Sequence, residues 1–212
     1  MDQLKVTATL DAPIVLGTSS YMTLDGILGS VLFDGLQDID AEHNAIPIKK
    51  TGDLYHASAM ITEPIDHRNL AFVASLQPGR SINPDLIKKA KTGKIHANVH
   101  SSTFVSVLNS YRTITASHAS WYVVGDADQI RKLLAQVQFI GKRRASGYGR
   151  VLSWDIDGTR TDGLLSYDMP IRPIPVDMFT GDKSLPIVDA AWRPAYWNLS
   201  NRAPCYAPSL IY

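Results

Sequence analysis

Residues 141–150 form the stretch of this sequence whose side chains have the clearest capacity for chemistry. They read Gly-Lys-Arg-Arg-Ala-Ser-Gly-Tyr-Gly-Arg and include no acidic residue. Lysine and arginine neutralise phosphates, glycine lets a ligand approach main-chain N–H groups, and an aromatic ring stacks on an unstacked base. The pattern therefore predicts contact with a nucleic-acid backbone, made by Lys142, Arg143, Arg144, Ser146, Gly147, Tyr148, Gly149 and Arg150.

Two other interpretations of this loop stay open on the sequence alone. The cations could lie in a solvated loop, where they interact favourably with the C-terminal end of the preceding helix dipole. Alternatively, they could make protein contacts in an assembly protein. A mononucleotide P-loop is excluded, because the pattern GxxxxGK[ST] is absent and the loop follows a helix.

The flanking residues predict a helix before the loop and a strand after it. Asp126 has the position of an N-cap, with Gln129 three residues later, and Gly141 ends the predicted helix. Apolar residues between them recur at helical spacing: Ile130, Leu133, Leu134, Val137 and Ile140. From 152 to 157 apolar and polar residues alternate, which predicts a strand that buries Leu152, Trp154 and Ile156.

The same loop resembles the signature loop of the RAMP superfamily of CRISPR proteins, in which two Gly-hydrophobic-Gly groups are separated by five residues. Gly147-Tyr148-Gly149 matches the second group and Gly141 matches the end of the first, whereas Phe139 stands where the first glycine would be. Leu24-Asp25-Gly26-Ile27-Leu28 is similar to the first helix of RAMP proteins. Tyr55-His56-Ala57-Ser58-Ala59 is similar to the following strand in the small subunit of type IV CRISPR complexes.

The order of predicted elements is that of an α+β protein. Strands are predicted near residues 4–10, 55–61, 69–76, 111–124 and 152–157, and helices near 23–35 and 126–140. Apart from one additional strand between the helices, this is the βαββαβ order of a ferredoxin-like fold, and the resemblance implies the same RNA-recognition-motif-like RAMP fold. Asp25 is interpreted as a first-turn acid that the helix dipole favours.

Residues 1–163 are predicted to form this RAMP ferredoxin-like domain, with a thumb-like insertion at about 78–110. Residues 164–212 hold seven of the twelve prolines, which predicts an extended Pro-rich C-terminal tail with little regular secondary structure. Trp192, Tyr196 and Trp197 make the tail too apolar for a disordered linker. We therefore expect it to pack on the domain or on a neighbouring subunit.

Basic charge is local in this chain of 212 residues, whose net charge is only +1. The acid-free stretches 88–94 and 142–150 hold eight of its 21 Lys and Arg residues. The first stretch is either a solvated surface or a second RNA contact through Lys88, Lys89, Lys91 and Lys94. With one cysteine, no leader and no bilayer-length apolar run, we expect a soluble, cytoplasmic protein, and the resemblance to CRISPR proteins implies a prokaryotic one.

Six histidines raise the question of metal binding or catalysis. His96 and His100 would need a third zinc ligand, and no HExxH motif or carboxylate run lies near, so we expect no metal and no cofactor. His118 is predicted to be a hydrogen-bonded core residue. Some RAMP relatives cleave CRISPR RNA without metal, and the sequence selects none of the candidates for that role: His43, His56, His67, His96, His100 and His118.

The resemblance implies a non-catalytic subunit of a type IV CRISPR ribonucleoprotein effector complex, most similar to the Cas5-like subunit. Such a subunit would hold the 5′ handle of the guide RNA and cap the filament of backbone subunits. It would meet target DNA through the complex, in defence against foreign DNA, and would have no membrane partner. The alternative is a metal-independent endoribonuclease that processes CRISPR repeat RNA.

Overall fold

The computed structural model of the protein describes residues 1–17, 21–36, 38, 43–74 and 107–209. The chain separates into two compact units, Met1–Arg68 with Thr113–Tyr212, and Asn69–Arg112. The described residues include the helices α1 (Leu24–Leu36) and α4 (Ala127–Leu134) and the 3-10 turns η2 (Arg144–Ser146) and η3 (Leu199–Asn201). The strands are β1 (Asp2–Leu10), β2 (Ile14–Val15), β3 (Lys50–Thr51), β4 (Leu54–Tyr55), β5 (Ile61–Thr62), β6 (Asp66–Ala74), β7 (Val107–Thr115), β8 (His118–Gly125), β9 (Val151–Gly158), β10 (Leu165–Ser166), β11 (Met169–Pro170), β12 (Ile174–Pro175), β13 (Ile187–Ala191) and β14 (Arg202–Tyr206).

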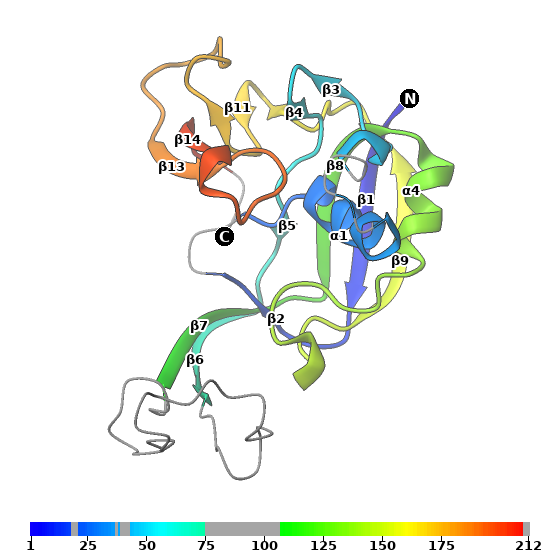
Figure 1. Ribbon diagram of the computed structural model, residues 1–212, viewed down its shortest axis with the longest axis vertical. Helices are drawn as coiled ribbons and strands as arrows, with labels where there is room; N and C mark the ends of the chain where they lie inside the picture. Colours follow the sequence, from blue (N-terminus) through cyan, green and yellow to red (C-terminus); the bar gives the residue numbers. More distant parts are fainter. Residues whose placement is uncertain (18–20, 37, 39–42, 75–106, 210–212) are drawn as a thin grey trace, which may run out of the picture. The chain divides into compact units, whose positions relative to one another are not determined.

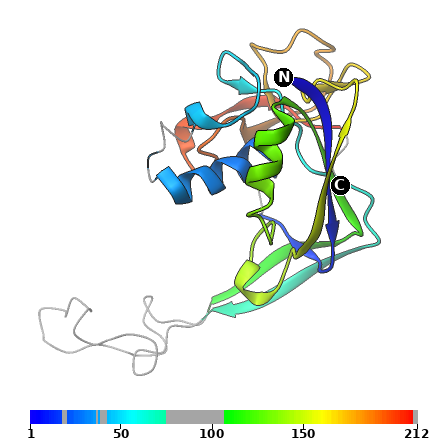
Figure 2. The same ribbon diagram turned by 90° about the vertical axis from the view of Figure 1, so that its right-hand side faces the viewer.

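The main sheet of the first unit has the strand order β5-β8-β1-β9, and its neighbouring strands are antiparallel. Helix α1 follows β1 in the chain, and α4 connects β8 to β9. Both helices lie on the same side of this sheet (Figures 1 and 2). The core between them joins Leu28 of α1 and Leu134 of α4 to Val6 and Trp121 of the sheet. The predicted α+β class is confirmed.

The periodic patterns at the start of the chain are also confirmed. Leu4, Val6, Ala8 and Leu10 of β1 are buried, and the residues between them are more exposed. Helix α1 begins directly after Thr23, as predicted, and extends to Leu36. Its buried residues lie in the N-terminal half, where the helix faces the sheet.

Leu152 lies outside the core, contrary to the alternation predicted for its strand. Thr9 of β1 pairs with Ser153, but Leu10 pairs with Val151, so β9 contains a bulge at Leu152. The bulge exchanges the inward and outward positions of the strand. Leu152 is consequently 58% exposed, whereas Val151 and Trp154 pack against the core.

The strand predicted at 111–124 is divided between two sheets, and this changes the environment of His118. Strand β7 ends at Thr115 and pairs with β2, whereas β8 begins at His118 and pairs with β1 and β5. After the interruption at 116–117 the buried positions alternate as Ala119, Trp121 and Val123, and Val124 and Gly125 at the end of the strand are buried as well. His118 is exposed, so the prediction of a core histidine is wrong.

The predicted strand at 55–61 is an extended, buried segment in which regular pairing is confined to β4 and β5. Between these strands, Ala57 forms an isolated bridge to Val123. The Ser58 hydroxyl accepts a hydrogen bond of 2.9 Å from the main-chain N–H of Tyr122. The segment is therefore held to β8 by side-chain as well as main-chain contacts.

In the second unit, the structure describes parts of β6 and β7, which are neighbours in one sheet. The rings of Phe72 and Tyr111 lie 5.8 Å apart between their centroids. Strand β6 begins at Asp66, earlier than the predicted 69. Residues 75–106 lie outside the described residues, and with them most of the predicted insertion, His96, His100, and the lysines Lys88, Lys89, Lys91 and Lys94.

Residues 164–209 form short strands and turns where an extended tail with little regular structure is predicted. Strands β12, β14 and β13 pair in one small sheet, and β10 pairs with β11. A second core cluster lies here, in which the rings of Phe179 and Tyr206 are 4.6 Å apart. This segment belongs to the same compact unit as Met1–Arg68.

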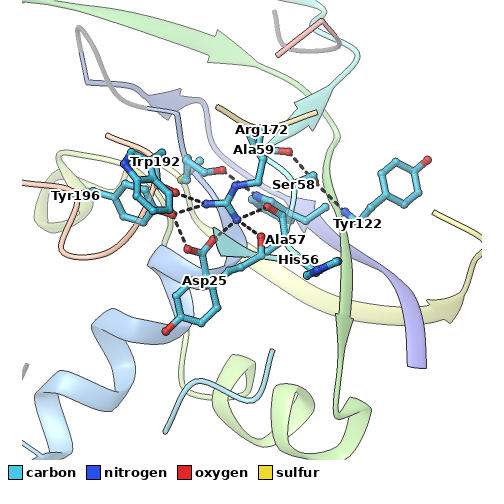
Figure 3. A network of polar contacts seen from close by, with 12 residues as sticks. Asp25, His56, Ala57, Ser58, Ala59, Tyr122, Arg172, Trp192 and Tyr196 are labelled. Carbon is cyan, nitrogen blue, oxygen red and sulfur yellow. Dashed lines mark hydrogen bonds and ion pairs between the residues drawn. The ribbon is translucent and has the colours of Figure 1, made fainter. Parts of the chain in front are cut away.

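Arg172, in the turn before β12, is fully buried and joins the tail to α1 (Figure 3). Its Nη1 atom lies 3.5 Å from the carboxylate of Asp25, which is also fully buried. Its Nη2 atom donates a hydrogen bond of 3.0 Å to the hydroxyl of Tyr196, which in turn donates to Asp25. Asp25 stands in the first turn of α1, as predicted, but its charge is balanced by a residue 147 positions later in the chain.

The same guanidinium also satisfies main-chain carbonyl groups of two other segments. Nη1 donates to the carbonyl oxygens of Tyr55 and Ala57, and Nη2 donates to that of Trp192 at 2.7 Å. Burial alone would lower the pKa of Arg172, but the Asp25 carboxylate and the Tyr196 hydroxyl outweigh it and raise that pKa. Burial, followed by the charge of Asp25, holds the pKa of Tyr196 well above its ordinary value. Arg172 therefore stays charged at any physiological pH.

Replacing Arg172 should strongly destabilise the first unit. In Arg172→Met the Asp25 carboxylate and several carbonyl groups lose their buried partner, and we expect a loss of about 3–5 kcal/mol in the free energy of unfolding. Arg202→Met is the matched control, because Arg202 also lies in the tail but pairs with a largely exposed Asp189. It should cost about 1 kcal/mol or less in urea denaturation. Equal losses in the two variants would contradict the role given to Arg172.

Candidate functional site

The glycine-rich loop at 141–150 has a defined backbone that depends on left-handed conformations. Gly141, Gly147 and Gly149 have φ values of 80°, 84° and 68°, and Arg143 has a φ of 59°. Between them, η2 forms a single 3-10 turn from Arg144 to Ser146. Because such φ values are costly for residues with a Cβ, the three glycines make this path possible.

Gly149 and Gly141 serve close approach to the protein's own backbone. A Cβ on Gly149 would lie 1.9 Å from the carbonyl oxygen of Ile140, and one on Gly141 would lie 2.7 Å from that of Val15. A Cβ on Gly147 would meet nothing within 4 Å. The expectation that the glycines open the main chain to a ligand therefore does not apply to Gly141 and Gly149, whose space is taken by the backbone of Val15 and Ile140.

Main-chain N–H groups of the loop are also used within the protein. Those of Lys142 and Gly149 donate to the carbonyl groups of Val15 and Pro13, each at 2.8 Å. Those of Ser146 and Gly147 donate within the loop itself. A ligand at this loop would therefore be held mainly by side chains.

Helix α4 ends earlier than predicted, so the residues that lead into the loop are not helical. The N-cap is confirmed, since the Asp126 carboxylate accepts hydrogen bonds from the N–H groups of Asp128 and Gln129. The helix stops at Leu134, however, and residues 138–140 instead run beside 149–151. The N–H of Ile140 donates to Gly149, and that of Val151 donates to Gln138. These inter-segment bonds replace the last helical turn that the apolar spacing suggests.

A groove of about 660 Å³ lies between α1 and the segment that leads into the loop. The loop contributes Lys142, Arg144 and Ala145 to its wall, and Lys142 and Arg144 are exposed. The remaining lining residues are Val15, Leu16, Gly17, Tyr21, Met22, Thr23, Gly26, Ile27, Ser30, Val31, Asp34, Gln136, Val137, Gln138, Phe139, Ile140, Gly141 and Tyr196. Cations at the rim, aromatic rings and amide groups thus share one concave surface.

The other predicted loop residues lie outside this groove. Gly147 and Arg150 line a separate hollow, and Arg150 forms an ion pair of 3.2 Å with Asp11. Arg143 and Tyr148 are half-buried, and Ser146 is exposed. The structure therefore brings Lys142 and Arg144 together at the groove, but it does not gather all predicted contact residues at one site.

Three aromatic residues of the groove were missed by the sequence analysis. Tyr21 precedes α1, Phe139 precedes the loop, and Tyr196 belongs to the tail. Burial raises the pKa of Tyr21 above its ordinary value. The sequence did contain an indication for Phe139, because this residue stands where the family pattern has its first glycine. Nothing near Tyr196 in the sequence relates it to the loop.

The face of the main sheet away from the helices has a different character. Thr7 pairs with Asp155 and Lys5 with Asp157 across β1 and β9, and both acids are exposed. The Thr7 hydroxyl lies 3.2 Å from that of Ser120. Exposed carboxylates repel phosphates, so this face suits nucleic acid less than the groove does.

None of the histidines that the structure describes lines the groove beside the loop. His56 is buried, with its Nε2 atom 2.8 Å from the Thr51 hydroxyl and its Nδ1 atom 3.3 Å from the Asp162 carbonyl oxygen. Within the described residues there is also no group of three or more His, Cys, Asp or Glu residues placed to hold a metal ion. No helix in that part of the chain is long and apolar enough to cross a bilayer.

Stability should decrease in mildly acidic solution because of His56. Burial, then the charge of Lys49, lowers its pKa below the ordinary value of 6.5, so the folded protein favours the neutral imidazole. As pH falls through about 6.5, the unfolded chain binds a proton that the folded chain does not, and stability is lost. Urea denaturation between pH 8 and pH 5 should show this loss, and His56→Gln should reduce it. An unchanged pH dependence in the variant would contradict the assignment.

Gly149→Ala should destabilise the protein far more than Gly147→Ala. Both changes introduce a left-handed residue with a Cβ, at a cost of about 1–2 kcal/mol. At Gly149 the new atom also collides with the carbonyl oxygen of Ile140, and we expect a total of roughly 3 kcal/mol or more. The measurement is the free energy of unfolding in urea. Similar values for the two variants would show that residues 138–140 are not held as described.

Comparison with known proteins identifies the family. The family model described as CRISPR type IV associated protein Csf3 matches residues 2–208. Among solved structures, one similar chain comes from a cryo-electron microscopy structure of the type III-B Cmr-beta complex bound to cognate target RNA. It has 13% sequence identity and a TM-score of 0.39, over 74% of this chain and 60% of that chain. No curated protein matches the chain.

The likeness to the Cmr-beta chain is too distant to carry a conclusion about function. The family match, in contrast, extends over nearly the whole sequence. It confirms the prediction of a protein associated with type IV CRISPR systems. The chain belongs to the family of the CRISPR type IV associated protein Csf3.

Proposed function

We propose that this chain is a non-catalytic RNA-binding subunit of a type IV CRISPR ribonucleoprotein effector complex. The observation that carries the proposal is the groove beside the glycine-rich loop, where the exposed Lys142 and Arg144 stand at the rim. Their side chains neutralise phosphates of a bound strand, and the rings of Tyr21, Phe139 and Tyr196 offer apolar surface to its bases.

The charges of the first unit support the groove as the RNA path. Asp34 lies on the α1 side of the groove, opposite in sign to Lys142 and Arg144. Phosphates therefore follow the loop side, and bases point toward α1. On the sheet face, Asp155 and Asp157 disfavour a phosphate backbone.

The fold that we propose is ferredoxin-like, of the RNA-recognition-motif type. The strand order β5-β8-β1-β9, with α1 after β1 and α4 between β8 and β9, supports this assignment. In this arrangement RNA binds on the helix side, beside the loop, and not on the open face of the sheet.

Within the complex, we assign the chain to the Cas5-like position. It holds the 5′ handle of the guide RNA and caps the filament of backbone subunits, while target DNA is selected by base pairing with the guide. The family match and the motifs of the loop support this placement. The second RNA contact through Lys88, Lys89, Lys91 and Lys94 remains a prediction.

The alternative of a metal-independent endoribonuclease calls for a histidine beside a lysine or tyrosine in the groove. Of the described histidines, His56 is buried in the protein's own hydrogen bonds, and His67 and His118 are exposed on strands. His43 lines a different pocket, together with Lys50 and Tyr55, and is the histidine that such an activity would use. None of the described histidines lines the groove beside the glycine-rich loop. Incubation of repeat RNA with the purified chain tests it, since site-specific cleavage without metal would overturn the non-catalytic assignment.

Removing the two groove cations should weaken RNA binding. The RNA is first identified by sequencing what co-purifies with the complex from a host that expresses the matching CRISPR locus. In Lys142→Ala with Arg144→Ala, we expect the affinity of the purified chain for that RNA to fall by about tenfold or more, because two charge-assisted contacts are lost. The slope of log K against log salt should decrease by about 0.7 for each lost contact.

The matched control is Arg131→Ala with Lys132→Ala, which removes the same charge from the exposed face of α4. These residues do not line the groove, so the control should bind RNA nearly as well as the wild-type chain. Equal affinity of both double variants, or a wild-type complex without RNA, would contradict the proposal. Loss of complex assembly with unchanged RNA affinity would assign the loop to protein contacts.

A further inference from the structure

A tail loop at residues 193–201 holds Trp197 in an exposed position on a well-fastened backbone. The Arg193 guanidinium pairs with Asp53 and donates a hydrogen bond of 2.9 Å to the Asn201 side chain. The Asn201 amide donates to the carbonyl oxygens of Pro194 and Ala195 at 2.8 and 3.2 Å. Trp197 is nevertheless 75% exposed. A large aromatic ring is thus presented to solvent by a loop with many internal bonds.

Trp197 stands at a pocket of about 580 Å³ whose lining is mostly polar. Lys50 lies in this wall, with its ammonium 4.7 Å from the centre of the Tyr55 ring. Asn44, Asn198 and His43 line the same pocket. Because Asp53 offsets the charge of Arg193, the charge of Lys50 leaves the lining positive. The pocket thus combines a stacking surface, a cation and amide groups.

This combination suits an unstacked base better than an apolar protein segment. A base stacks on an indole ring, its phosphate is neutralised by an ammonium group, and its polar edge bonds with amides. The centre of a protein interface, in contrast, is depleted in charged residues such as lysine. Leu199, two residues beyond Trp197, is 81% exposed but does not line the pocket.

The tail loop also connects this pocket with the groove of the proposed function. Tyr196 lines the groove and Trp197 lines the pocket, so adjacent residues of one loop face the two sites. Tyr196 is fastened by its bonds to Asp25 and Arg172. The groove and the pocket are therefore lined by neighbouring residues of the same tail loop.

We propose that the pocket formed by Lys50, Asn44, Asn198 and Trp197 binds an unstacked base of single-stranded RNA. The base stacks on Trp197, and the adjoining phosphate lies at Lys50. The inference rests on the proposed function, because the same RNA strand occupies the groove beside Lys142 and Arg144.

The test compares three variants of the purified full chain with the RNA that co-purifies with the complex. Trp197→Ala should weaken binding about 5- to 150-fold, the range that stacking of one base implies. Trp197→Phe keeps an aromatic ring and should stay within about threefold of the wild type. Leu199→Ala removes an equally exposed apolar group outside the pocket and should not change the affinity. Tryptophan emission should be quenched on RNA binding, and Trp197→Ala should lose that quenching.

The outcomes separate this proposal from the function on which it rests. If Trp197→Ala binds RNA normally while the Lys142 and Arg144 double variant does not, the pocket proposal is overturned and the groove assignment stands. If Trp197→Ala and Leu199→Ala lose association with other subunits but keep RNA affinity, the surface is a protein interface. If Trp197→Ala alone weakens RNA and the double variant does not, the groove assignment fails.

Discussion

The buried guanidinium of Arg172 is the interaction on which the arrangement of the first unit depends. A charge without water needs a counter-charge and a partner for its donors, and these come here from α1, from the segment at 55–57 and from the tail. The tail is therefore a structural part of the unit, although its strands are short. Tyr196 belongs to the same network. The loop that carries Trp197 is therefore anchored by the buried ion pair of Arg172 and Asp25.

In the glycine-rich loop, the main chain makes contacts within the protein, and the side chains of Lys142 and Arg144 are exposed. Gly141 and Gly149 allow neighbouring backbone to come closer than any Cβ would permit, and this locks the loop against residues 13–15 and 138–140. With its backbone committed to the protein, the loop offers Lys142 and Arg144 outward from a fixed frame. In the proposed function, a backbone that is already ordered loses little freedom when its side chains bind a flexible strand.

In the first unit, the open face of the main sheet differs in charge from the groove and the Trp197 pocket. The open sheet face carries hydroxyl groups and the carboxylates of Asp155 and Asp157. The groove and the Trp197 pocket combine cations with aromatic rings, and adjacent residues of one loop line them. In the proposed function, this difference in charge would favour single-stranded RNA on the helix side and at the tail over the sheet face.

Local signals in the sequence were enough for the α+β class, the alternation in β1, the start of α1, the Asp126 cap, the motifs that led to the family and the basic loop. Each of these depends on residues close together in the chain, where periodicity and capping chemistry act directly. Only the tertiary structure decided the bulge at Leu152, the end of α4 at Leu134 and the exposure of His118, because pairing with distant strands overrides local spacing. It alone brought Arg172 to Asp25 and Tyr196 to the groove, since contacts across more than a hundred residues leave no periodic trace in a single sequence.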